Sequence, residues 1–171
     1  HTPPFPGFFA AQPVGVQWSA VRDAVLAGEP LPAGVPLRHQ RVDDEGGERR
    51  LLVGLGEQPV RIRGVVELDL ATRWSFTNLW FDNRLEIRHA SVELDGCAAR
   101  QLYLHEPQAR TVSVSARASL FKQLLAPRAL VALEYVTVLE RLVAERLQAS
   151  DCLFLNQPRK DLIDFDVPAQ G

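Results

Sequence analysis

The feature that most constrains this chain is a series of short β-prone segments between residues 50 and 115. Residues 60–70 alternate apolar and polar side chains, and residues 74–81 are aromatic and β-prone, as expected for strands with a buried face. Turn pairs such as Asp82-Asn83 and Asp95-Gly96 separate the segments. Because no convincing helix lies between them, the pattern predicts an all-β body.

The N-terminal part predicts a different organisation. Residues 1–13 contain four prolines among phenylalanines, which indicates an extended arm, because proline cannot donate to a strand ladder. Residues 14–27 predict one short helix, since Val14, Trp18, Val21 and Val25 recur at helical spacing. Gly28 follows at the position of a C-terminal glycine cap. We therefore expect residues 1–49 to form an arm and a capping helix, residues 50–156 the β-rich body, and residues 157–171 a polar tail.

Residues 130–149 permit two interpretations. Leu139, Leu142, Val143 and Leu147 among charged residues give the pattern of an amphipathic helix. The same stretch also fits a repeat in which a small or polar residue precedes an apolar pair or alternation. The small or polar residues that begin the successive repeats, which we call the key residues, are separated by 28, 18 and 14 positions and are Ser91, Ser119, Thr137 and Asp151. The apolar residues that precede them are Ile87, Val114, Leu133 and Leu147.

A stacked β-solenoid accounts for such an irregular repeat, because inward positions stack into an apolar column while additional residues loop outward. We expect an all-β fold, a parallel β-solenoid that resembles a β-helix, with one short N-terminal helix. A β-sandwich or barrel with a C-terminal helix is the alternative, and a mixed α+β fold is a third possibility.

The segments at residues 133–139 and 145–154 resemble repeats of large bacterial β-helical proteins associated with phage-tail-like contractile particles. The resemblance covers residues 85–156. Glu140 and Arg141 stand where those repeats usually turn on glycine. The resemblance implies a spike, fibre or baseplate-associated structural element of bacterial origin rather than an enzyme.

Composition excludes several classes of partner. A formal net charge of −2 provides no basic surface for nucleic acid, and no apolar run approaches the length of a membrane span. We expect a soluble protein, located in the bacterial cytoplasm or in an extracellular particle. The sequence contains no methionine, which suggests a processed chain or a piece of a larger protein. Cys97 and Cys152 match no metal or redox motif, which favours buried free thiols.

Candidates for chemistry are few. His1 with His89 and His105 forms a possible copper site, because histidine nitrogens suit copper. We favour solvated charge pairs as the explanation of His89 and His105, and we expect no cofactor. The sequence has neither a nucleophile elbow nor a phosphate-binding loop. A polysaccharide-cleaving β-helix would need charged residues grouped on one outer face. The candidates near the C-terminus fit a solvated tail instead, and they are Arg159, Lys160, Asp161, Asp164 and Asp166.

Trp74, Phe76 and Trp80 offer a binding surface instead. Strict alternation places these three side chains on one face and Phe81 on the other. Such aromatic faces serve as core or as docking surfaces for proteins and sugars. We therefore predict a non-catalytic structural or interaction domain that binds protein partners or copies of itself. A carbohydrate-binding or carbohydrate-active domain is the alternative.

Overall fold

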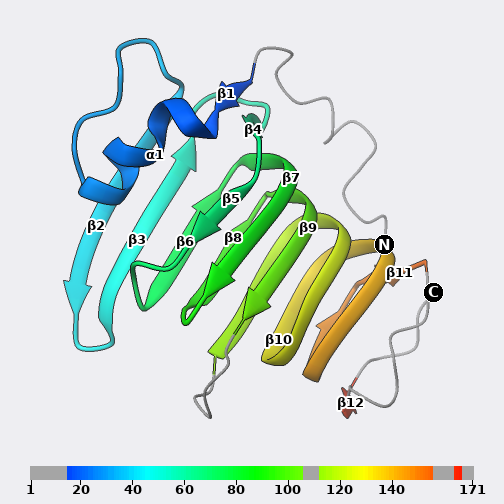
Figure 1. Cartoon of the computed structure of the whole chain (residues 1–171). Coiled ribbons are helices and arrows are strands. Elements are labelled where there is room, and N and C mark those ends of the chain that lie inside the picture. Colours follow the sequence, from blue (N-terminus) through cyan, green and yellow to red (C-terminus); the bar gives the residue numbers. More distant parts are fainter. Residues whose placement is uncertain (1–14, 106–111, 156–163, 167–171) are drawn as a thin grey trace.

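The computed structural model describes residues 15–105, 112–155 and 164–166, and their backbone coils into a parallel β-solenoid of about five turns (Figure 1). The described strands join in one 12-stranded sheet, in the order β1-β4-β7-β9-β10-β8-β6-β3-β2, while β5 pairs with β7 and both β11 and β12 pair with β10. The predicted solenoid is confirmed, and the alternative of a sandwich or barrel is wrong. Residues 130–149 are strand throughout, so the predicted helical interpretation of that stretch is also wrong.

The helix is α1 (Trp18–Ala27). The strands, in chain order, are β1 (Val16–Gln17), β2 (Leu37–Asp44), β3 (Gly47–Gly54), β4 (Val60–Arg63), β5 (Val66–Leu68), β6 (Arg73–Thr77), β7 (Leu79–Arg88), β8 (Ser91–Asp95), β9 (Ala98–His105), β10 (Val112–Ser150), β11 (Leu153–Phe154) and β12 (Asp164–Asp166). None of the helical segments in the described ranges is long and apolar enough to cross a membrane.

One complete coil runs through β6, both halves of β7 and into β8. The register pairs Arg73 with Ser91 and Trp80 with Ala98, and each partner lies one turn further along the chain. The 39 residues of β10 continue this winding without a break in strand assignment. Paired outward positions therefore have a neighbour directly above or below them on the next coil, although the register between β7 and β9 shifts between Phe81 and Arg84.

A column of left-handed residues marks one corner of the solenoid. Its members, which have φ between 50° and 64°, are Asn78, Gly96, Ala118, Tyr135 and Asp151. The residue after each of them is buried, and these residues are Leu79, Cys97, Ser119, Val136 and Cys152. Such a residue turns the chain sharply and interrupts the alternation, because the residue before each corner is exposed whereas the residue after it points into the core.

The repeat register expected from the sequence differs from this corner. Leu120 pairs with Ala98, so that Ser119 is equivalent to Cys97, whereas Ser91 lies beside Arg73 in a different strand of the coil. Thr137 pairs with Leu153 and not with Asp151. The predicted equivalence of these key residues is therefore wrong, because small residues also occur away from this corner and do not identify it.

The helix covers the N-terminal end of the stack. It begins at Trp18, later than predicted, because Val16–Gln17 extends as β1 and pairs with β4. The predicted glycine cap is confirmed, since Gly28 is left-handed with φ 72°. The buried side chains of α1 join the solenoid core, and they are Trp18, Val21 and Val25. Beside α1, β2 and β3 form an antiparallel hairpin, so pairing begins N-terminal of Arg50.

Candidate binding groove

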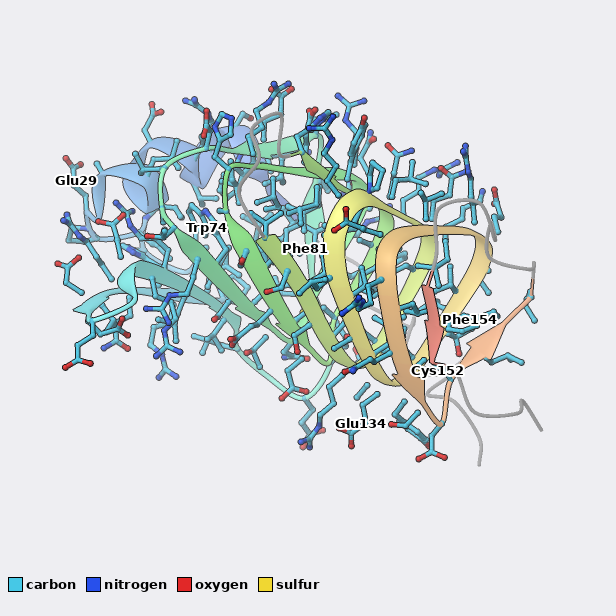
Figure 2. The ribbon with its side chains drawn as sticks, turned by 90° about the horizontal axis from the view of Figure 1, so that it is seen from below. Glu29, Trp74, Phe81, Glu134, Cys152 and Phe154 are labelled. Atoms are coloured by element: carbon cyan, nitrogen blue, oxygen red, sulfur yellow. The ribbon has the colours of Figure 1, made fainter. Side chains whose placement is uncertain are left out.

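Trp80 is the predicted binding residue that the fold directs outward. Trp74 and Phe76 precede the left-handed Asn78 and are buried, as is Phe81 after it (Figure 2). The Phe76 ring lies 5.9 Å from that of Trp74 and 5.2 Å from that of Phe81, so the three form an aromatic core layer. The predicted common face of Trp74, Phe76 and Trp80 is therefore wrong, because Asn78 interrupts the alternation on which it depended.

The outward Trp80 borders a small apolar hollow. Trp80 pairs with Ala98, and Ala98 pairs with Leu120, so these side chains form one column across three coils. The short side chain of Ala98 between two large ones leaves a hollow of about 220 Å³, which Leu139 also lines. Arg61 lies 5.0 Å from the Trp80 ring centroid and pairs with Asp82 at 3.1 Å. The Trp80 ring is therefore held at the rim by a cation that is itself fixed.

A polar hollow of about 240 Å³ adjoins the apolar one. Along its wall, the Gln101 amide donates to Gln123 at 2.9 Å, and the Gln123 amide donates to Glu140 at 3.4 Å. Lys122 pairs with Glu140 at 3.1 Å. Arg100 and Lys122 line both hollows, so the two halves form one groove, which we call the Trp80 groove.

Arg100 is the distinctive charge of the Trp80 groove. Its side chain is exposed and forms no hydrogen bond or ion pair with any residue in the described ranges. The basic side chains that line the groove are Arg84, Arg100 and Lys122, against the acidic Asp82 and Glu140. An arginine with all its donors available beside an apolar hollow suits a ligand that carries an acidic group next to an apolar one.

His89 and His105 lie on adjacent coils, where the His89 backbone N–H donates to the His105 carbonyl at 3.1 Å. Their rings contact carboxylates, His89 that of Asp69 at 3.1 Å and His105 that of Glu86 at 2.6 Å. The contact of His89 lies among exposed side chains, as in the predicted solvated pair, whereas the Glu86 partner of His105 is buried. Within the described part of the chain, no three His, Cys, Asp or Glu side chains are grouped to hold a metal ion. His1 lies outside the described residues, so the copper site stays a prediction.

The C-terminal candidates are mostly outside the described residues as well. The candidates outside the described residues are Arg159, Lys160 and Asp161. The other two, Asp164 and Asp166, lie on β12, which pairs with Arg146–Gln148 of β10. The groove residues Ala98, Arg100 and Lys122 were not predicted from the sequence. Their only sequence signal is a shared outward position on neighbouring coils, which requires the coil register to be known.

Cys97 and Cys152 are both free and buried, as predicted. Burial is the largest influence on the Cys97 thiol and raises its pKa to about 12. The same cause raises the pKa of Cys152. Neither thiol lines the groove.

Comparison of the chain with protein-family models, with curated protein sequences and with solved structures gives no match.

Proposed function

We propose that this protein is a non-catalytic interaction domain of a larger assembly, and that the Trp80 groove binds a short segment of a protein partner that carries an acidic side chain beside an apolar one. The observation that carries this proposal is the placement of Arg100, whose side chain has no partner among the described residues, between the apolar and polar hollows. Tryptophan and arginine are, with tyrosine, the residues most often responsible for binding energy at protein interfaces.

The shape of the groove favours a peptide segment. Trp80, Ala98 and Leu120 present an apolar column that a partner's side chain can fill, while Arg100 and Lys122 lie at its edge to pair with a carboxylate. The solenoid scaffold supports this role, because each of these residues is held by ladder bonds on a neighbouring coil. A groove built on strands needs little reordering when a partner binds, which lowers the entropic cost of association.

The kind of assembly follows from the resemblance of residues 85–156 to repeats of phage-tail-like particles. We propose that the domain is a spike, fibre or baseplate-associated element of such a particle. The solenoid fold is compatible with this proposal.

Selection of a random peptide library displayed on phage against the full chain tests the groove. We expect enriched peptides to contain Asp or Glu next to an aliphatic or aromatic residue, and their binding to fall at least tenfold in Trp80→Ala and in Arg100→Glu. Arg117→Glu is the matched control, since Arg117 is exposed and lines neither hollow. Enriched peptides that bind both groove variants as well as the wild type would overturn the proposal, and so would a failure to enrich any peptide.

A carbohydrate partner is the second candidate, favoured by the accessible Trp80 ring beside the Gln101 and Gln123 amides. A glycan array probed with the wild type, Trp80→Ala and Arg100→Glu distinguishes the two candidates. Binding to acidic glycans that both substitutions remove would replace the peptide by a sugar as the ligand. If no glycan binds in this way, the carbohydrate alternative is ruled out.

A further inference from the structure

Strand β2 has one edge that no described strand covers. It is the last strand in the sheet order, it pairs with β3 alone, and Figure 1 shows it as the outermost strand at one end of the stack. The strand runs regularly from Leu37 to Asp44 with no register shift against β3 and contains no proline. Such an edge carries a row of backbone donors and acceptors that can pair with another strand.

The register of the hairpin tells which residues face that edge. The Leu55 N–H donates to the Pro36 carbonyl at 2.9 Å, so the pair Pro36–Leu55 is hydrogen-bonded. Hydrogen-bonded pairs alternate with non-bonded pairs in an antiparallel ladder, so the even-numbered residues of β2 direct their backbone groups to β3. The odd-numbered residues direct theirs outward, and these are Leu37, His39, Arg41 and Asp43.

We propose that a second copy of this chain pairs with β2 in an antiparallel fashion, with the two-fold axis passing between the two Arg41 residues. Outward-facing residues must lie opposite outward-facing residues, so only registers that pair odd with odd positions are allowed. With Arg41 opposite itself, Arg38 lies opposite Asp44 and His39 lies opposite Asp43, each twice across the axis.

Charge complementarity favours this register over the one with its axis through Gln40. If the axis passed through Gln40, Arg38 would lie opposite Val42, and both complementary pairs would be lost. An axis through Val42 would place Arg41 opposite Asp43 but Arg38 opposite Gly46, so the effect of Arg38→Glu separates that register from the proposed one. Charged side chains normally discourage edge pairing, but here the basic half of β2 meets the acidic half of its copy.

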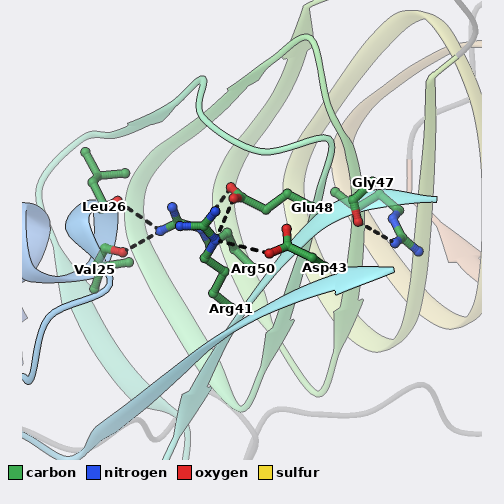
Figure 3. Close-up of polar contacts among 8 residues, drawn as sticks. Val25, Leu26, Arg41, Asp43, Gly47, Glu48 and Arg50 are labelled. Carbon is green, nitrogen blue, oxygen red and sulfur yellow. Dashed lines mark hydrogen bonds and ion pairs between the residues drawn. The ribbon is translucent and has the colours of Figure 1, made fainter. Parts of the chain in front are cut away.

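The two Arg41 side chains are the unfavourable pair at the axis. In each copy, however, Arg41 Nε lies 2.7 Å from the Glu48 carboxylate and 3.8 Å from that of Asp43 (Figure 3). Each Arg41 is therefore already paired closely with Glu48 of its own hairpin, which reduces the repulsion across the axis.

Size-exclusion chromatography with light scattering on the full chain tests the association. We expect a dimeric mass for the wild type and a monomeric mass for Arg38→Glu, because a glutamate at this position faces Asp44. The exposed Arg117 lies on β10 and not on this edge, so Arg117→Glu is expected to remain dimeric. A wild type that is monomeric at every concentration, or an Arg38→Glu variant that stays dimeric, would overturn the proposal.

Single cysteines then test the register. In the proposed dimer the two Arg41 Cα atoms form a hydrogen-bonded pair about 5.5 Å apart, within reach of a disulfide. Arg41→Cys is therefore expected to give a cross-linked dimer on mild oxidation, whereas Gln40→Cys is not. Preferential cross-linking of Gln40→Cys would sink the proposed register. Binding to the Trp80 groove is expected to be unchanged in Arg38→Glu, so the two proposals can fail separately.

Discussion

Asn78 fixes the corner of one coil directly onto Gly54 of the preceding coil. Its side-chain amide donates to the carbonyl oxygens of Gly54, Gly56 and Gln58 at 3.0, 3.1 and 3.3 Å. The backbone carbonyl of Asn78 in turn lies so close that a Cβ atom on Gly54 would be 2.1 Å from its oxygen. The loop after β3 and the corner after β6 therefore form one interlocked unit.

Gly54→Ala is expected to lower the free energy of unfolding by about 3 kcal/mol, at the upper end of the usual cost of overpacking, because backbone atoms must move apart. Chemical denaturation followed by far-ultraviolet circular dichroism measures the loss. Asn78→Asp keeps the size and the tolerance of left-handed backbone but replaces the amide donors by a carboxylate that faces three carbonyl oxygens, so we expect a loss of about 1–3 kcal/mol. Equal stability of Gly54→Ala and the wild type would contradict this contact.

The strand content was predictable from the sequence, because alternation and turn pairs report local backbone preference. The corner register was not. Ala118 and Tyr135 turn the chain in left-handed conformations that neither residue type favours, so the sequence carries no turn signal at those points. Here stacking on neighbouring coils overrides local preference.

The same limit applies to the candidate site. Trp80 was predicted to bind a partner together with Trp74 and Phe76, which are buried instead. The corner at Asn78, which the sequence did not predict, places Trp80 on the outward side of the strand, opposite to Trp74 and Phe76. Arg100 could not be predicted as a site residue without the coil register, because strand pairing between distant segments brings it next to the Trp80 column.

Ala118→Gly is expected to stabilise the protein by about 0.5–1 kcal/mol, because Ala118 has φ 50° and glycine removes the steric cost of that conformation. The measurement is the shift of the denaturation midpoint. Ala132→Gly is the matched control, since Ala132 is an exposed strand residue without positive φ, and we expect it to destabilise the protein. A loss of stability in Ala118→Gly would show that the corner is not strained.

Trp74→Ala and Trp80→Ala are expected to differ strongly. Trp74 is 1% exposed inside the aromatic layer, so its removal should cost about 3–5 kcal/mol through the cavity it leaves. Trp80 points outward, so its replacement by alanine should lower the free energy of unfolding by less than about 1.5 kcal/mol, because the hollow beside it is already open to solvent. Denaturation curves of the two variants give both values, and similar losses would contradict the proposed orientations.

Arg50 links the first coils to the helix that covers them. Its guanidinium is buried and donates to the Val25 and Leu26 carbonyls at 2.8 and 3.0 Å, while its Nε donates to Glu48 at 3.1 Å (Figure 3). Arg50→Met keeps the aliphatic stem but removes these bonds, so we expect a loss of about 3 kcal/mol and a weaker helical signal. Arg41→Met, which breaks an exposed pair with the same Glu48, should cost less than about 1 kcal/mol.

The buried Cys97 predicts a dependence of stability on alkaline pH. Its thiol has an ordinary pKa of 9.0 when unfolded and a pKa raised to about 12 in the folded protein, chiefly by burial. The unfolded chain therefore loses this proton first, so the stabilising contribution is complete below pH 9 and decreases as the pH rises toward 12. The expected slope from this group approaches about 1.4 kcal/mol per pH unit within that window.

Denaturation series from pH 8 to pH 11 on the wild type and on Cys97→Ala measure this contribution by difference, since all other groups are shared. We expect the wild type to lose stability more steeply above pH 9 than Cys97→Ala, whatever the absolute cost of the substitution. Cys152 adds to the slope in both proteins, because burial raises its pKa as well. Parallel curves for the two proteins would mean that the Cys97 thiol ionises as readily in the folded chain as in the unfolded one.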